Sequence, residues 1–319
     1  MSNARNQRAA RADCTWVTAP RQILPGKTYF LTRRSSQRQF FLRPTPETRS
    51  IFDYCLAEEA ARNGIILIAW LAMSNHYHAV ANDPEGRMPA FLEHFHKLLA
   101  KSMNAHLGRR ENFWSTEETC VTHLPTPADI FDKIVYVLAN PVAAGIVATV
   151  SAWLGSSAWT LLGGGTVVCK RPEGAFFSKT GRMPEEAILE AAAPEAIRGS
   201  EPVDAWVKRI HAAISAKERF IADDRRERGA KLPTREELTS GSPFATPTTP
   251  ATKSELRPTI ACKVKAIRMQ LLALQRAFRT LYQAARLRFR EGERDVAFPA
   301  GTYRLRAWGA RCDAYPPAA

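Results

Sequence analysis

The chain has 319 residues, 45% of them apolar, which is enough to bury the core of one large domain or two ordinary ones. Its 45 Lys and Arg against 31 Asp and Glu give a formal net charge of +14. This charge attracts polyanions, so nucleic acid is the first partner to consider. No apolar run approaches the roughly 18 residues of a membrane-spanning helix, so we expect no membrane partner.

The first 22 residues are basic but lack the apolar stretch of an export signal, and residues 1–19 are expected to form a disordered basic arm. The six cysteines lie far apart in the sequence and form no CxxC pair. This spacing is typical of reduced thiols, so we expect a cytoplasmic protein.

Short runs of β-branched or apolar residues predict strands, and apolar residues three and four apart predict helices. The nearly continuous apolar run Ile65–Met73 is typical of a central strand buried on both faces. Thr126, Pro127 and Asp129 supply the N-cap, first-turn proline and acid of a helix. In chain order, we expect a strand at 28–32, a helix at 46–63, strands at 65–73 and 76–82, a helix at 88–107, a strand at 119–124 and a helix at 128–140.

The order βαββαβ, followed by an extra helix, is the split-βαβ pattern of ferredoxin-like domains. We therefore predict an α+β fold in which a sheet carries helices on one face, over residues 20–160. Beyond it we expect a charged helical extension at 161–239, a linker rich in Pro, Ser and Thr at 240–252, and a basic helical region at 253–319.

The basic C-terminal region has nine Lys or Arg and no acid between Arg257 and Arg290. Its apolar residues follow each other at steps of four and three, which predicts one amphipathic helix with a seam. Such a helix can pack on the core or pair in a homodimer, and present arginines to phosphate. The seam consists of Ile260, Val264, Ile267, Leu271, Leu274, Phe278 and Leu281.

The chain contains two His-x-His triplets. His76 and His78 fall in a predicted strand, where residues two apart point to the same face and both imidazoles can reach one cation. His94 and His96 fall in a predicted helix, where residues two apart diverge by about 200°. The second pair is therefore interpreted as two partly exposed histidines that flank a core residue. For the first pair, chelation and simple hydrogen bonding on a half-buried strand both remain open.

The helix predicted over 128–140 places Tyr136 and Asn140 on the same side, away from its apolar stripe. A tyrosine in a helix more often packs in a core or an interface than it catalyses, and an asparagine before proline commonly ends a helix. These two residues alone assign no function.

Four blocks together carry more information: Met73–His78, Asn112–Trp114, Tyr136–Gly145 and Gly155–Trp159. Their order and spacing resemble those of the REP-associated tyrosine transposases, which belong to the HUH single-tyrosine transposase superfamily. The resemblance covers about residues 25–160, roughly half of the chain.

The resemblance implies a metal-dependent single-stranded DNA endonuclease and strand transferase that acts on hairpin or palindromic DNA. It makes His76 and His78 the metal ligands, Asn140 the third ligand and Tyr136 the nucleophile, which would form a 5′-phosphotyrosine. Two neutral imidazoles and an amide oxygen suit Mg²⁺ or Mn²⁺. A protonated phenol is a poor nucleophile, so it needs such a cation at the scissile phosphate.

Two other functions compete with this one. The first is an inert, domesticated DNA-binding protein, and the second is a zinc hydrolase, which the absence of an HExxH-like helix and of a carboxylate at ligand spacing disfavours. For either nucleic-acid function, the candidate DNA-binding residues are Arg33, Lys97, Lys101, Arg109, Arg110, Lys263, Lys265, Arg268, Arg276, Arg279 and Arg286.

Overall fold

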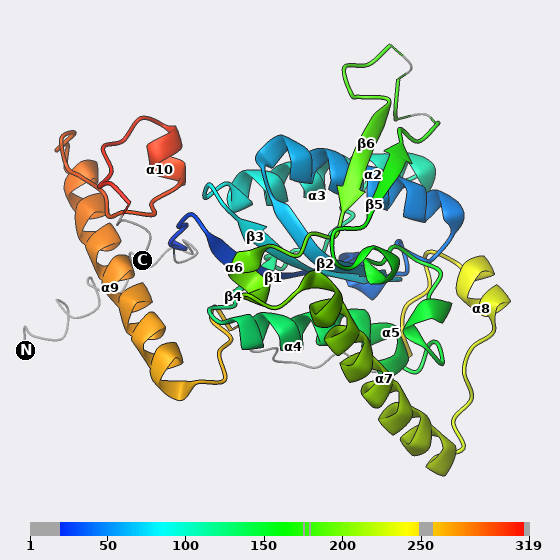
Figure 1. Cartoon of the computed structure of the whole chain (residues 1–319). Coiled ribbons are helices and arrows are strands. Elements are labelled where there is room, and N and C mark those ends of the chain that lie inside the picture. Colours follow the sequence, from blue (N-terminus) through cyan, green and yellow to red (C-terminus); the bar gives the residue numbers. More distant parts are fainter. Residues whose placement is uncertain (1–19, 175, 179, 249–257, 316–319) are drawn as a thin grey trace, which may run out of the picture. The chain divides into compact units, whose positions relative to one another are not determined.

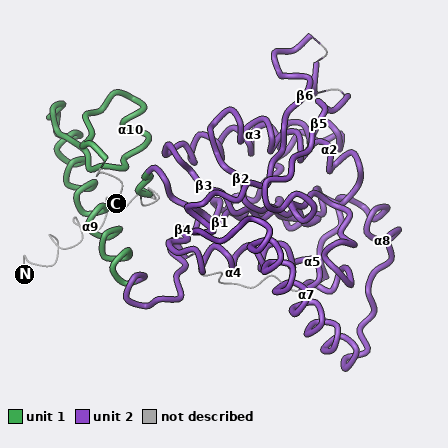
Figure 2. Tube along the Cα trace, viewed as in Figure 1, with its two compact units in different colours: residues 1–24, 269–319 green, residues 25–268 purple. Residues whose placement is uncertain are grey.

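The structure, a computed structural model, describes residues 20–174, 176–178, 180–248 and 258–315 (Figure 1). The expected basic arm at 1–19 lies outside the described residues. The chain divides into two compact units, one of residues 25–268 and one of residues 1–24 with 269–319 (Figure 2). Within the described part, no helix is long and apolar enough to cross a membrane.

The larger unit is built around a four-stranded sheet in the order β2-β3-β1-β4, and its neighbouring strands are antiparallel. Helix α2 joins β1 to β2 and helix α3 joins β3 to β4, which confirms the predicted ferredoxin-like α+β fold. The elements are β1 (Lys27–Arg34), α2 (Pro46–Asn63), β2 (Ile66–Met73), β3 (His76–Asp83), α3 (Met88–His106) and β4 (Cys120–His123).

Both faces of this sheet are covered. The two crossover helices lie on one face, where Tyr77 of β3 packs against Phe52 of α2 and Phe95 of α3. The extra helix, α4 (Pro127–Leu138), lies on the opposite face (Figure 1) and is followed by the short α5 (Asn140–Ala143). The face of the sheet that α4 crosses is the one that carries His76 and His78.

The outer edge of β2 is closed by the segment around Ser156. The Ala72 N–H donates to the Ser156 carbonyl over 2.9 Å, and the Trp70 indole N–H donates to the Ser156 hydroxyl over 3.0 Å. Gly155 must be glycine, since a Cβ there would lie 2.7 Å from the Trp153 indole nitrogen and 3.0 Å from the Ala72 carbonyl oxygen. This segment protects the sheet from edge-to-edge pairing.

The extension beyond residue 160 belongs to the same unit as the sheet. We expected it to be helical, but it also contains two strands. It opens with an antiparallel hairpin, β5 (Thr166–Lys170) and β6 (Glu186–Glu190), which packs on α2. Residues of β6 alternate between exposed and buried, a period-two pattern that the high charge of the segment obscured. The remaining elements are α6 (Glu195–Arg198), α7 (Val203–Glu227), α8 (Arg235–Ser240) and 3₁₀ turns at Ser36–Arg38, Val150–Ala152 and Trp159–Leu161.

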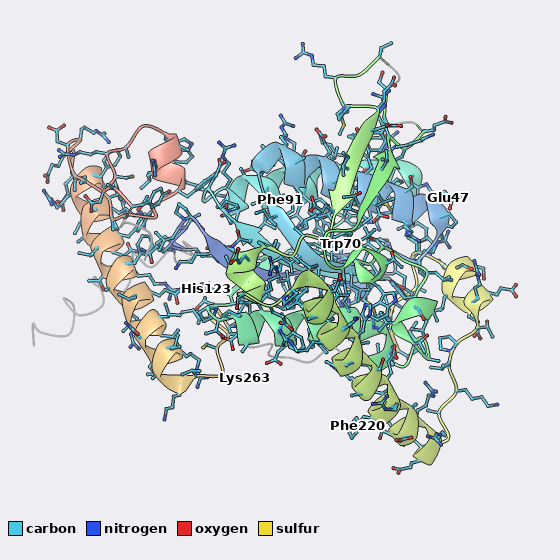
Figure 3. All side chains as sticks on the ribbon, in the orientation of Figure 1. Glu47, Trp70, Phe91, His123, Phe220 and Lys263 are labelled. Atoms are coloured by element: carbon cyan, nitrogen blue, oxygen red, sulfur yellow. The ribbon has the colours of Figure 1, made fainter. Side chains whose placement is uncertain are left out.

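Residues 258–263 extend the sheet at β4 instead of starting the basic helix. The His123 N–H donates to the Thr259 carbonyl over 2.9 Å, and the Ala261 N–H donates to the His123 carbonyl over 3.0 Å. The Lys263 N–H then donates to the Asp129 carboxylate over 2.9 Å, at the start of α4. Figure 3 labels His123 and Lys263. The expected helix therefore begins only at Lys265, as α9 (Lys265–Arg290), so Ile260 and Val264 of the predicted seam lie before it.

The smaller unit contains most of α9 and the short α10 (Arg304–Ala307). Ala285 of α9 is buried in a cluster with Val296 and Phe298, and Phe278 of α9 is also buried. Other residues of the predicted seam, Leu274 among them, are exposed, so only part of that seam packs within the unit.

The burial of His123, at the end of β4, can be tested through the dependence of stability on pH. Burial, with a smaller contribution from Lys27, lowers its pKa from the ordinary 6.5 to about 4. Between these values the unfolded chain binds a proton that the folded chain does not, so the free energy of unfolding falls as the pH falls. We expect wild type to lose about 2 kcal/mol relative to His123→Gln between pH 7 and pH 4.5. Urea unfolding of both proteins at both pH values measures this; a constant difference contradicts it.

Candidate active site

The first His-x-His triplet brings two imidazoles together on one face of β3. The Nε2 atoms of His76 and His78 lie 3.1 Å apart. Burial, and then Arg34, lowers the pKa of His76 to about 4, and burial, and then His76 and Lys133, lowers the pKa of His78 well below its ordinary value. Both rings are therefore neutral at physiological pH, the form that ligates metals.

A hydrogen bond to Asn75 fixes which nitrogen of His76 carries the proton. The Asn75 amide N–H donates to the Arg38 carbonyl over 3.2 Å, so its Oδ1 is left to accept from Nδ1 of His76 over 2.7 Å. The proton is then on Nδ1, and the lone pair on Nε2 points toward His78. Orientation of an imidazole by a hydrogen bond to its other nitrogen is a common feature of metal-ligating histidines.

The donor set fits a small, hard divalent cation. Neighbouring ligands at about 2.1 Å from an octahedral cation lie about 3.0 Å apart, close to the separation of the two Nε2 atoms. The Asn140 side-chain amide lies 3.5 Å from His78 Nε2, and a half-turn of that amide presents its oxygen instead of its nitrogen. Among the described residues no three His, Cys, Asp or Glu side chains gather as a metal group. A cation held by two imidazoles and an amide oxygen would keep coordination positions open for other ligands.

Tyr136 stands beside the histidines and remains 40% exposed. Its ring centroid lies 5.6 Å from that of His78 and 5.9 Å from that of Phe30. The Nζ of Lys133 lies 4.6 Å from the tyrosine ring centroid, and that of Lys217 lies 5.7 Å from it. A phenol next to two cations and a pair of neutral imidazoles is placed for chemistry on an anion.

Lys217 did not stand out in the sequence, and no local pattern could have found it. It comes from α7, whose packing against α4 depends on contacts between distant parts of the chain. Lys133 lies one turn before Tyr136 on α4, so helical spacing alone places it on the same side of the helix.

Of the two histidines in the second His-x-His triplet, both expected to be partly exposed, one is buried. His94 is partly exposed as expected, but His96 is buried and faces the sheet. Arg33 donates to His96 Nδ1 over 2.7 Å, so the proton is on Nε2, which donates to the Tyr77 hydroxyl over 2.7 Å. This hydrogen bond fixes the side chain of Tyr77, which lies between His76 and His78 in the sequence, on the opposite face of the sheet. The Arg33 guanidinium also lies over the Trp114 ring, at 5.3 Å, which favours a packing role over DNA contact.

We expect His96→Ala to destabilise the fold by about 3 kcal/mol or more, because it leaves Arg33 and Tyr77 without their shared partner. His94→Ala, at a partly exposed position, should cost less than about 0.5 kcal/mol. Urea unfolding measures both. Neither variant should abolish metal-dependent cleavage by the molecules that remain folded. Equal stability of the two variants would contradict the network.

No protein-family model matches the chain, and no curated protein matches it. Among solved structures it is similar to a REP-associated tyrosine transposase bound to a REP hairpin, with 18% identity, 46% of this chain and 84% of the other covered, and a TM-score of 0.39. It is also similar to a protein from Deinococcus radiodurans R1 classed as a transposase, with 22% identity, 33% of this chain and 84% of the other covered, and a TM-score of 0.27.

The candidate DNA-binding residues occupy different settings in the structure. Lys97, Lys101 and Arg110 are exposed. The Arg109 guanidinium lies over the Phe41 ring, 3.7 Å from its centroid. Lys263 pairs with Asp132 of α4 and Arg268 donates to the Cys262 carbonyl, whereas the remaining candidates, all on α9, are exposed or half-buried: Lys265, Arg276, Arg279 and Arg286. Their contact with DNA remains a prediction.

Proposed function

We propose that this protein is a metal-dependent transposase that cuts and rejoins single-stranded DNA, and that hairpin DNA is its substrate. One observation carries the proposal. Two neutral imidazoles with their Nε2 atoms 3.1 Å apart lie on the same sheet face as the exposed Tyr136, whose ring is 5.6 Å from His78. The solved transposase complex with a REP hairpin agrees with the choice of substrate.

His76, His78 and Asn140 would hold Mg²⁺ or Mn²⁺, which when bound polarises the scissile phosphate and offsets its charge. The Tyr136 hydroxyl gives its proton to water and attacks phosphorus, and the bond from phosphorus to the 3′ oxygen breaks as that oxygen takes a proton from water. The products are a 5′-phosphotyrosine and a free 3′-hydroxyl. Lys133 and Lys217 lie where they favour the phenolate. One phosphodiester replaces another, so rejoining needs no ATP.

A denaturing gel of the protein with 5′- or 3′-labelled hairpin DNA and Mn²⁺ tests this proposal. The attack written above attaches the protein to the new 5′ end, so only the strand segment downstream of the cut should move with the protein. Protease should remove the shift, and EDTA should prevent it. DNA binding without any adduct would instead indicate an inert DNA-binding protein.

The exposed basic residues of α9 predict a separate contribution to affinity. We expect deletion of residues 269–319 to weaken hairpin binding and to flatten the dependence of log affinity on log salt, by about 0.7 for each phosphate that α9 no longer neutralises. The deletion starts after residues 258–263 because these pair with β4. Cleavage at saturating DNA should persist. An unchanged salt slope with an altered oligomeric mass would assign α9 to a homodimer instead.

A further inference from the structure

A cavity of about 200 Å³ opens between α4 and the face of the sheet that α4 crosses. Strands β1 and β4, helix α4 and the segment at 258–261 all contribute to its wall. The residues that matter for its chemistry are Phe30, Arg34, Glu117, Thr122, Lys133 and Ala261. The two histidines and the tyrosine of the candidate site do not line this cavity.

The cavity adjoins the nucleophile through two shared residues. The Phe30 ring centroid is 5.3 Å from that of His78 and 5.9 Å from that of Tyr136. The Lys133 Nζ lies 4.6 Å from the ring centroids of both Phe30 and Tyr136. A DNA strand with its phosphate at Tyr136 therefore has a neighbouring nucleoside within reach of this cavity.

The lining suits a flat ring with polar edges. Phe30, Pro258 and Ala261 supply apolar surface, and Arg34 and Glu117 form an ion pair 2.9 Å long beside it. Arginine only donates hydrogen bonds and ionised glutamate only accepts them, so together they match the adjacent acceptor and donor groups on the edge of a base. A cavity of about 150 Å³ holds a benzene ring, so one of about 200 Å³ suits a single substituted ring better than a fused pair.

We propose that this pocket binds one unpaired pyrimidine next to the scissile phosphate, that residues 258–261 close the pocket, and that Arg34 and Glu117 determine which base is accepted. The inference rests on the proposed function, since it takes single-stranded DNA as the ligand. The segment is held in place by backbone bonds to His123 and by the Thr122 hydroxyl, which donates to the Pro258 carbonyl over 2.7 Å. Residues far along the chain thus complete a pocket beside the nucleophile.

The test uses a series of hairpin DNAs, each with a single abasic site at a different position of the unpaired flank. Fluorescence anisotropy in the presence of EDTA measures the affinity of the protein for each DNA. We expect one position at which the abasic site weakens wild-type binding about tenfold, as loss of a stacked base does. Ala261→Phe, which fills the cavity, should bind the intact DNA about tenfold more weakly and lose sensitivity at that position only. Ala266→Phe, at an exposed position on α9, is the matched control and should behave as wild type.

A second variant keeps the test decisive if Ala261→Phe does not fold. Glu117→Gln preserves the size of the side chain but replaces a carboxylate, which only accepts hydrogen bonds, with an amide, which donates and accepts them. It should therefore change the preferred base at the sensitive position. Equal sensitivity at all positions, or a purine preferred over a pyrimidine there, overturns the pocket proposal. Because the scan needs no cleavage, a position-specific effect without a covalent adduct would retain the pocket and reject the nuclease.

Discussion

Tyr136→Phe is expected to abolish the covalent protein–DNA adduct while single-strand affinity changes by less than about threefold. The substitution removes only the hydroxyl, which is the group that would attack phosphorus. The ring, with its contacts to Phe30, His78 and Lys133, is retained, so the neighbourhood of the histidines should not change. Charge contacts dominate affinity for single strands and are also untouched. Denaturing gels and anisotropy on the same samples measure both effects.

Other tyrosines provide the controls. Tyr282→Phe, in the smaller unit, should form the adduct as wild type does. Tyr77 and Tyr54 are buried, with hydroxyls bonded to His96 and to the Pro184 carbonyl, so neither is placed to reach DNA. An adduct that persists in Tyr136→Phe would show that the nucleophile lies elsewhere, and would leave the fold but not the assignment of Tyr136 standing.

The ferredoxin-like part of the fold could be predicted because its signals are local. The Thr126 hydroxyl accepts from the Asp129 N–H over 3.1 Å, as the cap pattern indicated, and α4 starts at Pro127. Helix α2 spans the predicted residues, and Gly64, with φ of 64°, ends it. Alternation, caps and breakers act within a few residues, so the sequence displays them directly.

Contacts between distant residues could not be predicted in this way. The pairing of residues 258–261 with β4, and the position of Lys217 beside Tyr136, depend on the path of the whole chain. The basic helix shows the same limit. Its seam predicted that Leu274 and Phe278 would share one environment, yet only Phe278 is buried. Periodicity identifies an apolar face, but it does not identify what covers that face.

The four blocks that carry the resemblance have different roles in the structure. Met73–His78 and Tyr136–Gly145 bring His76, His78, Asn140 and Tyr136 into one region, as the resemblance implied. In the other two blocks, Trp114 packs on His96 and Ser156 closes the edge of β2. The four blocks therefore include residues that pack beside the sheet or close its edge as well as candidate catalytic residues.

His76→Ala and His78→Ala are each expected to lower Mn²⁺ affinity at least about 100-fold and to eliminate metal-dependent cleavage. Each removes one of only two imidazole ligands, and loss of supporting groups alone already costs about 10- to 100-fold at metal sites. Isothermal titration of the DNA-free protein with Mn²⁺ measures the affinity without reference to activity. Cleavage of hairpin DNA across a range of Mn²⁺ concentrations then shows whether excess metal restores the rate.

His94→Ala is the matched control, because it removes a histidine from the other His-x-His triplet without approaching the site. It should bind Mn²⁺ and cleave as wild type does. The two test variants should also remain folded. His78 Nδ1 has no hydrogen-bond partner among the described residues, so His78→Ala removes a poorly satisfied buried group along with the ligand. Equal Mn²⁺ affinity in wild type and in both variants would exclude this histidine pair as the metal site, and with it the proposed chemistry at Tyr136.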